Sequence, residues 1–145
     1  DSSGPALMHG ISAKPYMVKV NQHELSGFFK RELNNFDDQL QAIKELQETG
    51  IPIVAISRGA DGMIVTDGND TFEAKLTMES IINVVGAGDS LLAGISKALV
   101  EGHNTKELAR WGVACGTANT QVAGAGFITL DLVKQLLSRV KITQI

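Results

Sequence analysis

The chain has 145 residues, of which 43% are hydrophobic and 20% are charged, and its formal net charge is −3. This composition is typical of one globular domain with a real core, and the lack of basic charge argues against a nucleic-acid partner. No apolar run reaches the roughly 20 residues that a membrane-crossing helix needs, so we expect no membrane partner. A single cysteine, Cys115, excludes an internal disulfide and fits a cytoplasmic location.

Helices and strands are predicted to alternate along the chain. The predicted helices are residues 5–12, 21 to about 33, 37 or 38 to 50, about 89–100, about 105–122 and 129–137. The predicted strands are residues 16–20, 51–57, 63–66, 71–77 and 140–145. The turn at 67–70 favours one β-hairpin, and the continuous apolar run at 51–57 is typical of a parallel strand buried on both faces. The sequence therefore predicts an α/β layered fold with a mostly parallel central sheet and one β-hairpin.

The strongest local signal is a glycine loop, Val85-Gly86-Ala87-Gly88-Asp89-Ser90, that leads directly into an apolar helix. Two glycines let the backbone turn tightly at a helix start, so that several N–H groups can point at one anion. Asp89 adds a carboxylate beside that anion. Phosphoryl transfer to an alcohol needs this pairing of phosphate donors with an acceptor for the hydroxyl proton. A tight turn in which Asp89 only caps the helix would use the same residues.

A second cluster follows the strand at 16–20. Asn21 and Glu24 have the spacing of a capping box, and a carboxylate at a strand end could also hold waters of a Mg²⁺ ion. The two interpretations are compatible. Lys19 could project from the same strand end toward a phosphate, or lie in solvent.

Two more clusters have both a structural and a functional interpretation. Ser57, Gly59, Ala60 and Gly62 form a glycine turn after a buried strand, which is either an ordinary connection or a backbone nest against a nucleotide. The sequence Cys115-Gly116-Thr117-Ala118-Asn119 gives a helix face of small residues. Such a face allows close helix packing, and it equally leaves room for a flat purine ring.

Taken together and in this order, the four clusters resemble the ribokinase-like (PfkB) family of carbohydrate kinases. Residues 84–90 with Ala93-Gly94 resemble its C-terminal signature. Residues 19–21 with Glu24-Leu25, the ending 140–145 and the beginning 1–7 are similar to its hexose-phosphate branch, which contains 1-phosphofructokinase and tagatose-6-phosphate kinase. The resemblance implies a three-layer ribokinase-like fold. It covers residues 1–145, but only the C-terminal, nucleotide-binding half of such an enzyme.

The resemblance implies MgATP-dependent phosphorylation of a primary hydroxyl of a ketohexose phosphate, either fructose 1-phosphate or tagatose 6-phosphate. Asp89 would accept the hydroxyl proton, and the N–H groups of Gly86, Ala87 and Gly88 would form the anion hole. By the same resemblance, Asn21 and Glu24 would position Mg²⁺ through water, and Lys19 would contact a phosphate. The nucleotide phosphates and ribose would lie against Ser57, Gly59, Ala60 and Gly62. The adenine would lie near Gly116 and Asn119.

The chain departs from the family pattern at two places. Asn83-Val84 stands where many members have Asp-Thr, which puts in doubt the monovalent-cation site of some relatives. Val20 replaces the proline that usually follows the lysine in the hexose-phosphate branch. Neither change touches the predicted anion hole.

Two other functions would use part of the same pattern. A non-catalytic nucleotide- or anion-binding domain would gain nothing from Asp89, because a carboxylate beside a phosphate costs free energy. A dinucleotide-binding enzyme fits poorly, because the loop lacks the third glycine and the later acidic residue. We also expect the chain alone to be inactive, with a sheet edge that pairs or aggregates, and a homodimer is one assembly that the sequence leaves open.

Overall fold

Apolar residues alternate between the two faces of one central sheet. The computed structural model describes residues 1–145, and its five strands pair in the order β1-β2-β3-β4-β5. The strands are β1 (Met17–Asn21), β2 (Ile53–Ser57), β3 (Met63–Thr66), β4 (Thr71–Lys75) and β5 (Lys141–Gln144). In β2, Ile53 and Ala55 pack into one hydrophobic cluster while Val54 and Ile56 pack into another. The strand is therefore buried on both faces.

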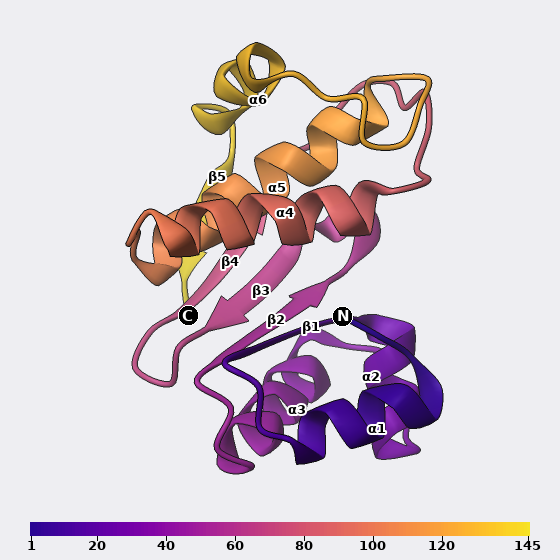
Figure 1. Ribbon diagram of the computed structural model, residues 1–145, viewed down its shortest axis with the longest axis vertical. Coiled ribbons are helices and arrows are strands. Elements are labelled where there is room, and N and C mark those ends of the chain that lie inside the picture. The colour runs from indigo at the N-terminus through magenta and orange to yellow at the C-terminus, as the bar shows by residue number, and fades with distance from the viewer.

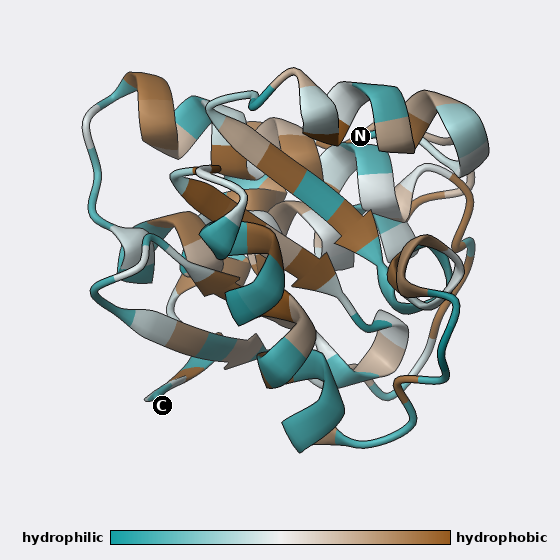
Figure 2. Cartoon of the chain, turned by 90° about the horizontal axis from the view of Figure 1, so that it is seen from below, coloured by the Kyte–Doolittle hydropathy of each residue, from teal (hydrophilic) through white to brown (hydrophobic).

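Six helices cover the two faces of the sheet (Figure 1). They are α1 (Gly4–Ser12), α2 (Gln22–Phe29), α3 (Phe36–Glu48), α4 (Ala87–Val100), α5 (Thr105–Thr120) and α6 (Leu130–Leu137), and η1 (Gly59–Asp61) is a short 3₁₀ turn. The helices α1, α2 and α3 pack on one face, and α4, α5 and α6 pack on the other. Figure 2 shows the hydrophobic strands between these helical layers. The predicted three-layer α/β fold is confirmed.

The sheet is mostly antiparallel, so the prediction of a mostly parallel sheet is wrong. Only β1 and β2 run parallel, whereas β2–β3, β3–β4 and β4–β5 are antiparallel pairs. Parallel neighbours need a crossover of about a dozen residues or more, and only residues 58–62 join β2 to β3. The apolar run in β2 reflects its position between two helical layers, not parallel partners on both sides. The hairpin predicted at 67–70 is confirmed.

Side-chain caps fix most helix starts. Asn21, Asn35, Asn104 and Thr129 each accept a hydrogen bond from a backbone N–H in the first turn of the helix that follows. The helix predicted to reach about residue 33 ends at Phe29, because Lys30 adopts a left-handed conformation with φ of 52°. No helix is both long enough and apolar enough to cross a bilayer.

Helices α4 and α5 approach each other at glycines. A Cβ atom on Gly94 would lie 2.5 Å from the Trp111 carbonyl oxygen and 2.8 Å from Cys115 Sγ. A Cβ atom on Gly112 would lie 2.8 Å from Ile95 Cγ1. The small residues predicted on α5 therefore do allow close helix packing.

Candidate active site

A cavity of about 310 Å³ lies between the start of α4, the face of α5 and the turn after β2. The residues predicted to contact a nucleotide that line it are Ser57, Gly59, Ala60, Gly62 and Gly116, joined by Ala87 and Gly88 of the predicted anion hole. These residues come from three separate parts of the chain. The fold thus brings these predicted site residues together around one cavity.

The cavity also has an apolar lining, which was not predicted from the sequence. Leu76, Met78, Ile81, Leu91 and Val113 contribute hydrophobic side chains to it. On α5, the lining residues Val113, Gly116, Thr117 and Thr120 recur at helical spacing, which marks one face of the helix. That periodicity was the available signal. The result is a cavity with an apolar wall and a glycine-lined edge.

The glycine loop turns into α4 with free backbone donors. Gly86 has φ of 79°, and a Cβ atom there would lie 2.9 Å from Ala125 Cβ, so the position requires glycine. The Ala87 N–H donates to the Val84 carbonyl oxygen at 3.2 Å, whereas the N–H groups of Gly86, Gly88 and Asp89 bond to no other group of the chain. Free N–H groups at a helix N-terminus form an anion-binding site. Asp89 N–H, which was not predicted, therefore joins the donors, and Ala87 N–H is already committed.

The Asp89 side chain is exposed at the first turn of α4 and takes part in no ion pair. Its carboxylate is therefore free to accept a proton or a hydrogen bond from a ligand.

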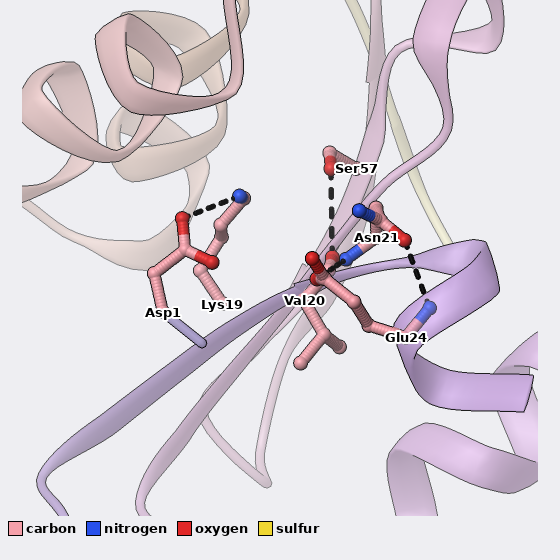
Figure 3. Close-up of polar contacts among 6 residues, drawn as sticks. All are labelled: Asp1, Lys19, Val20, Asn21, Glu24 and Ser57. Carbon is pink, nitrogen blue, oxygen red and sulfur yellow. Dashed lines mark hydrogen bonds and ion pairs between the residues drawn. The ribbon is translucent and has the colours of Figure 1, made fainter. Parts of the chain in front are cut away.

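Lys19 brings a positive charge to the same place. Its side chain is only 5% exposed, and Nζ donates to Asp1 Oδ2 at 2.6 Å (Figure 3). A Cβ atom on Gly88 would lie 3.3 Å from Lys19 Nζ, so the ammonium group lies beside the glycine loop. Burial lowers the pKa of Lys19, and the charges of Glu24 and Asp89 offset part of this effect. The solvent alternative for Lys19 is excluded.

Asn21 and Glu24 form the capping box that their spacing predicted (Figure 3). Asn21 Oδ1 accepts from the Glu24 N–H at 2.9 Å, and Glu24 Oε2 accepts from the Asn21 N–H at 2.8 Å. No group of three or more His, Cys, Asp or Glu side chains converges on a point where it could hold a metal ion. Glu24 Oε1 accepts no hydrogen bond from the chain, so it can accept one from a metal-bound water. The residues present therefore fit Mg²⁺ through water.

Asn119 occupies a different place from the one predicted. It does not line the cavity and its side chain is fully buried. Its Nδ2 donates to the Val85 carbonyl oxygen at 2.8 Å, and its Oδ1 accepts from the Gly126 N–H at 2.7 Å and from Ser90 Oγ at 3.2 Å. Asn119 therefore braces the glycine loop from behind and offers no group to an adenine.

The turn after β2 lies against β4. Gly62 has φ of 79° and ψ of −129°, and a Cβ atom there would lie 2.0 Å from the Ala74 carbonyl oxygen. Gly59 also has a positive φ, of 59°, but open space surrounds it. The turn is thus fixed at Gly62 and open toward the cavity at Gly59.

Known proteins resemble this chain along its whole length. A family model described as pfkB family carbohydrate kinase matches residues 1–131. The 1-phosphofructokinases of Haemophilus influenzae and Bacillus subtilis are each 32% identical to the chain over 100% of its length and 47% of theirs. The chain thus spans about half the length of the curated relatives it matches. The matches confirm the predicted extent, but they do not support the predicted placement in the C-terminal half.

Solved structures give the same result. Phosphofructokinase-2 from Escherichia coli in complex with potassium has a TM-score of 0.90 and 31% identity, over 95% of this chain and 45% of that one. Ribokinase from Arabidopsis thaliana complexed with ribose and ATP has a TM-score of 0.76 and 25% identity, over 83% of this chain and 40% of that one.

Proposed function

Since the chain belongs to the pfkB family of carbohydrate kinases, we propose that it supplies the nucleotide site and the catalytic base of a sugar-phosphate kinase. The reaction we propose is transfer of the terminal phosphoryl group of ATP to a primary hydroxyl of a ketohexose phosphate. The names of the relatives favour fructose 1-phosphate over tagatose 6-phosphate as the acceptor. The observation that carries the proposal is an exposed carboxylate, Asp89, beside unbonded N–H groups at the mouth of a nucleotide-sized cavity.

The nucleotide would lie along the cavity with its base against the apolar wall. Val113 and Gly116 of α5 and Leu91 of α4 supply a mostly hydrophobic surface. The Gly59 and Gly62 turn lies at the edge of the same cavity, where its backbone can approach ribose and phosphates closely. The phosphates would then reach the start of α4.

The start of α4 can hold the transferring phosphoryl group. Gly86, Gly88 and Asp89 carry N–H groups with no partner in the chain, and Lys19 places an ammonium group beside Gly88. Donors fixed in place before the reaction stabilise charge that develops on the phosphoryl oxygens. Mg²⁺, when bound, would neutralise phosphate charge, with Glu24 holding one of its waters and Asn21 fixing the Glu24 side chain.

Asp89 would align the acceptor hydroxyl and take its proton. A carboxylate is a weak base at neutral pH, but phosphoryl transfer passes through a loose transition state in which the hydroxyl loses its proton late. A weak, well-placed base therefore suffices. A domain that only bound nucleotide would have no use for this charge, because it lies next to the phosphate site.

Asp89→Asn in the protein that carries this chain tests the proposal. We expect kcat to fall about 10²- to 10⁴-fold, the usual contribution of a general base, while the dissociation constant for ATP changes less than about twofold. Asp131→Asn is the matched control, because Asp131 also lies exposed in the first turn of a helix. Near-normal turnover of Asp89→Asn would remove Asp89 from the mechanism. ATP binding without any sugar-phosphate-dependent turnover by the parent protein would support a non-catalytic binding domain instead.

A further inference from the structure

Arg58 lies in the sequence between two cavity-lining residues, Ser57 and Gly59, yet it does not line the cavity. Ser57 pairs with Met63, whose side chain packs on the α4 and α5 face of the sheet. The Arg58 side chain reaches the opposite face, where its guanidinium carbon lies 5.3 Å above the ring of Phe36 in α3. This arginine is therefore not in a position to contact a nucleotide.

On that opposite face Arg58 pairs with Glu73 of β4. Glu73 is paired with Ile64, whose side chain belongs to the cluster under α1, α2 and α3. Arg58 Nη2 donates to Glu73 Oε1, and the Arg58 side chain is only 9% exposed. The guanidinium is thus held between α3 and β4.

The same arginine bonds to the turn that lines the cavity. Its backbone N–H donates to the Gly62 carbonyl oxygen at 2.8 Å, and Nη2 donates to the Asp61 carbonyl oxygen, also at 2.8 Å. In return the Asp61 N–H donates to the Arg58 carbonyl oxygen at 3.1 Å. The far end of the turn is therefore tied, through one guanidinium, to β4 and α3.

The contribution of Arg58 to the stability of the fold does not by itself explain an arginine at this position. Its Nε atom is buried and has no hydrogen-bond partner. A buried, unpaired donor costs free energy, and apolar residues of similar volume often replace buried ion pairs without loss. An arginine at this position is better explained by the geometry that it imposes on the turn.

We propose that Arg58 is a positioning residue for the nucleotide site, which holds the Gly59–Asp61 turn and Gly62 in the conformation that lines the cavity. The inference rests on the proposed function, because it assigns the turn to the nucleotide. Arg58 touches neither substrate, so its loss should weaken nucleotide binding and leave the phosphoryl-transfer step nearly intact.

The test measures KM for ATP, KM for the sugar phosphate and kcat separately in the complete protein. We expect Arg58→Met to raise the KM for ATP about tenfold, the effect of one lost charge-assisted hydrogen bond. We expect kcat and the KM for sugar phosphate to stay within about twofold. Glu73→Gln keeps an oxygen that can accept a hydrogen bond from the guanidinium, whereas Glu73→Leu removes it. Glu73→Gln should therefore raise the KM for ATP less than Glu73→Leu does.

Arg31→Met is the control for the loss of an arginine–carboxylate pair away from the turn. Arg31 also pairs with a carboxylate, Glu45, at 2.9 Å, and its guanidinium carbon lies 4.9 Å above an aromatic ring, that of Phe29. Arg31 makes no hydrogen bond or ion pair with the turn, so the KM for ATP of Arg31→Met should equal that of the parent protein. A shift equal to that of Arg58→Met would show that loss of any such pair loosens the protein, and would overturn the proposal.

The outcomes separate this inference from the function on which it rests. If the parent protein neither binds ATP nor turns over, the proposed function fails. If the parent is active and Arg58→Met keeps the parental KM for ATP, or loses kcat instead, only the positioning role is refuted. Should Arg58→Met not fold, Arg58→Lys and Glu73→Leu decide, since an unchanged KM for ATP in both also refutes it.

Discussion

Replacing Gly62 with alanine should be far more harmful than the same change at Gly59, three residues earlier in the same turn. Both glycines have a positive φ, which alone costs an alanine about 1 kcal/mol. At Gly62 the added Cβ would also lie 2.0 Å from the Ala74 carbonyl oxygen. Ala74 cannot yield, because it is paired on both sides, with Met63 of β3 and with Ile142 of β5.

The clash and the unusual ψ of −129° at Gly62 together set the expected size of the effect. Backbone strain of this kind costs about 1–3 kcal/mol, and overpacking adds about 1–3 kcal/mol. We therefore expect Gly62→Ala to lower the free energy of unfolding by about 4 kcal/mol and Gly59→Ala by about 1 kcal/mol.

Equilibrium unfolding in urea, followed by the fluorescence of the single tryptophan Trp111, measures both values. The comparison is sound if the slope of the free energy against urea is the same in the two variants. A difference between them of less than about 1 kcal/mol would refute the reasoning, since it would mean that the turn moves away from β4 without penalty.

Two further changes probe other parts of the structure. Asn119→Ala removes the hydrogen-bond partner of the Val85 carbonyl and of the Gly126 N–H, so it should lower the free energy of unfolding by about 2 kcal/mol and weaken ATP binding. Unchanged ATP affinity by titration would contradict the role of Asn119 behind the glycine loop. Burial would raise the pKa of Asp67, but hydrogen bonds from the Asp70 N–H, the Thr105 hydroxyl and the Asn69 N–H outweigh it and lower this pKa. Ionised Asp67 therefore stabilises the fold above its unfolded pKa of about 4, and this stabilisation is lost as the pH falls through the lower pKa of the folded state. Asp67→Asn should then make the unfolding free energy fall less steeply with pH below about 4. An equally steep fall in the variant would contradict this role of Asp67.

The parts of the site that the sequence predicted are those with local signals. The glycine loop, the turn with Ser57 and Gly59, and the capping box of Asn21 and Glu24 each lie within a few consecutive residues. Their chemistry follows from residue type and from the strand or helix boundary beside them. These signals also sufficed for the layers of the fold.

The parts that the sequence did not predict depend on pairings between distant segments. The direction of β3 follows from the short connection 58–62, because a parallel partner would need a crossover of about a dozen residues or more. The contact of Arg58 with Glu73 depends on the residue pairing between β3 and β4. The ion pair of Lys19 with Asp1 depends on where the first residues of the chain lie relative to β1. The resemblance places Asn119 near the adenine, but the Asn119 amide is hydrogen-bonded inside the protein.

The glycines where α4 and α5 cross limit how these two helices can move relative to each other. Because Trp111 and Cys115 lie so close to Gly94, the packing leaves no space for one helix to slide along the other. We therefore expect the donors at the start of α4 and the wall on α5 to keep their separation while a ligand enters or leaves. We expect adjustment to the size of the ligand to come from residues 76–86, which connect β4 to α4 and supply part of the cavity lining.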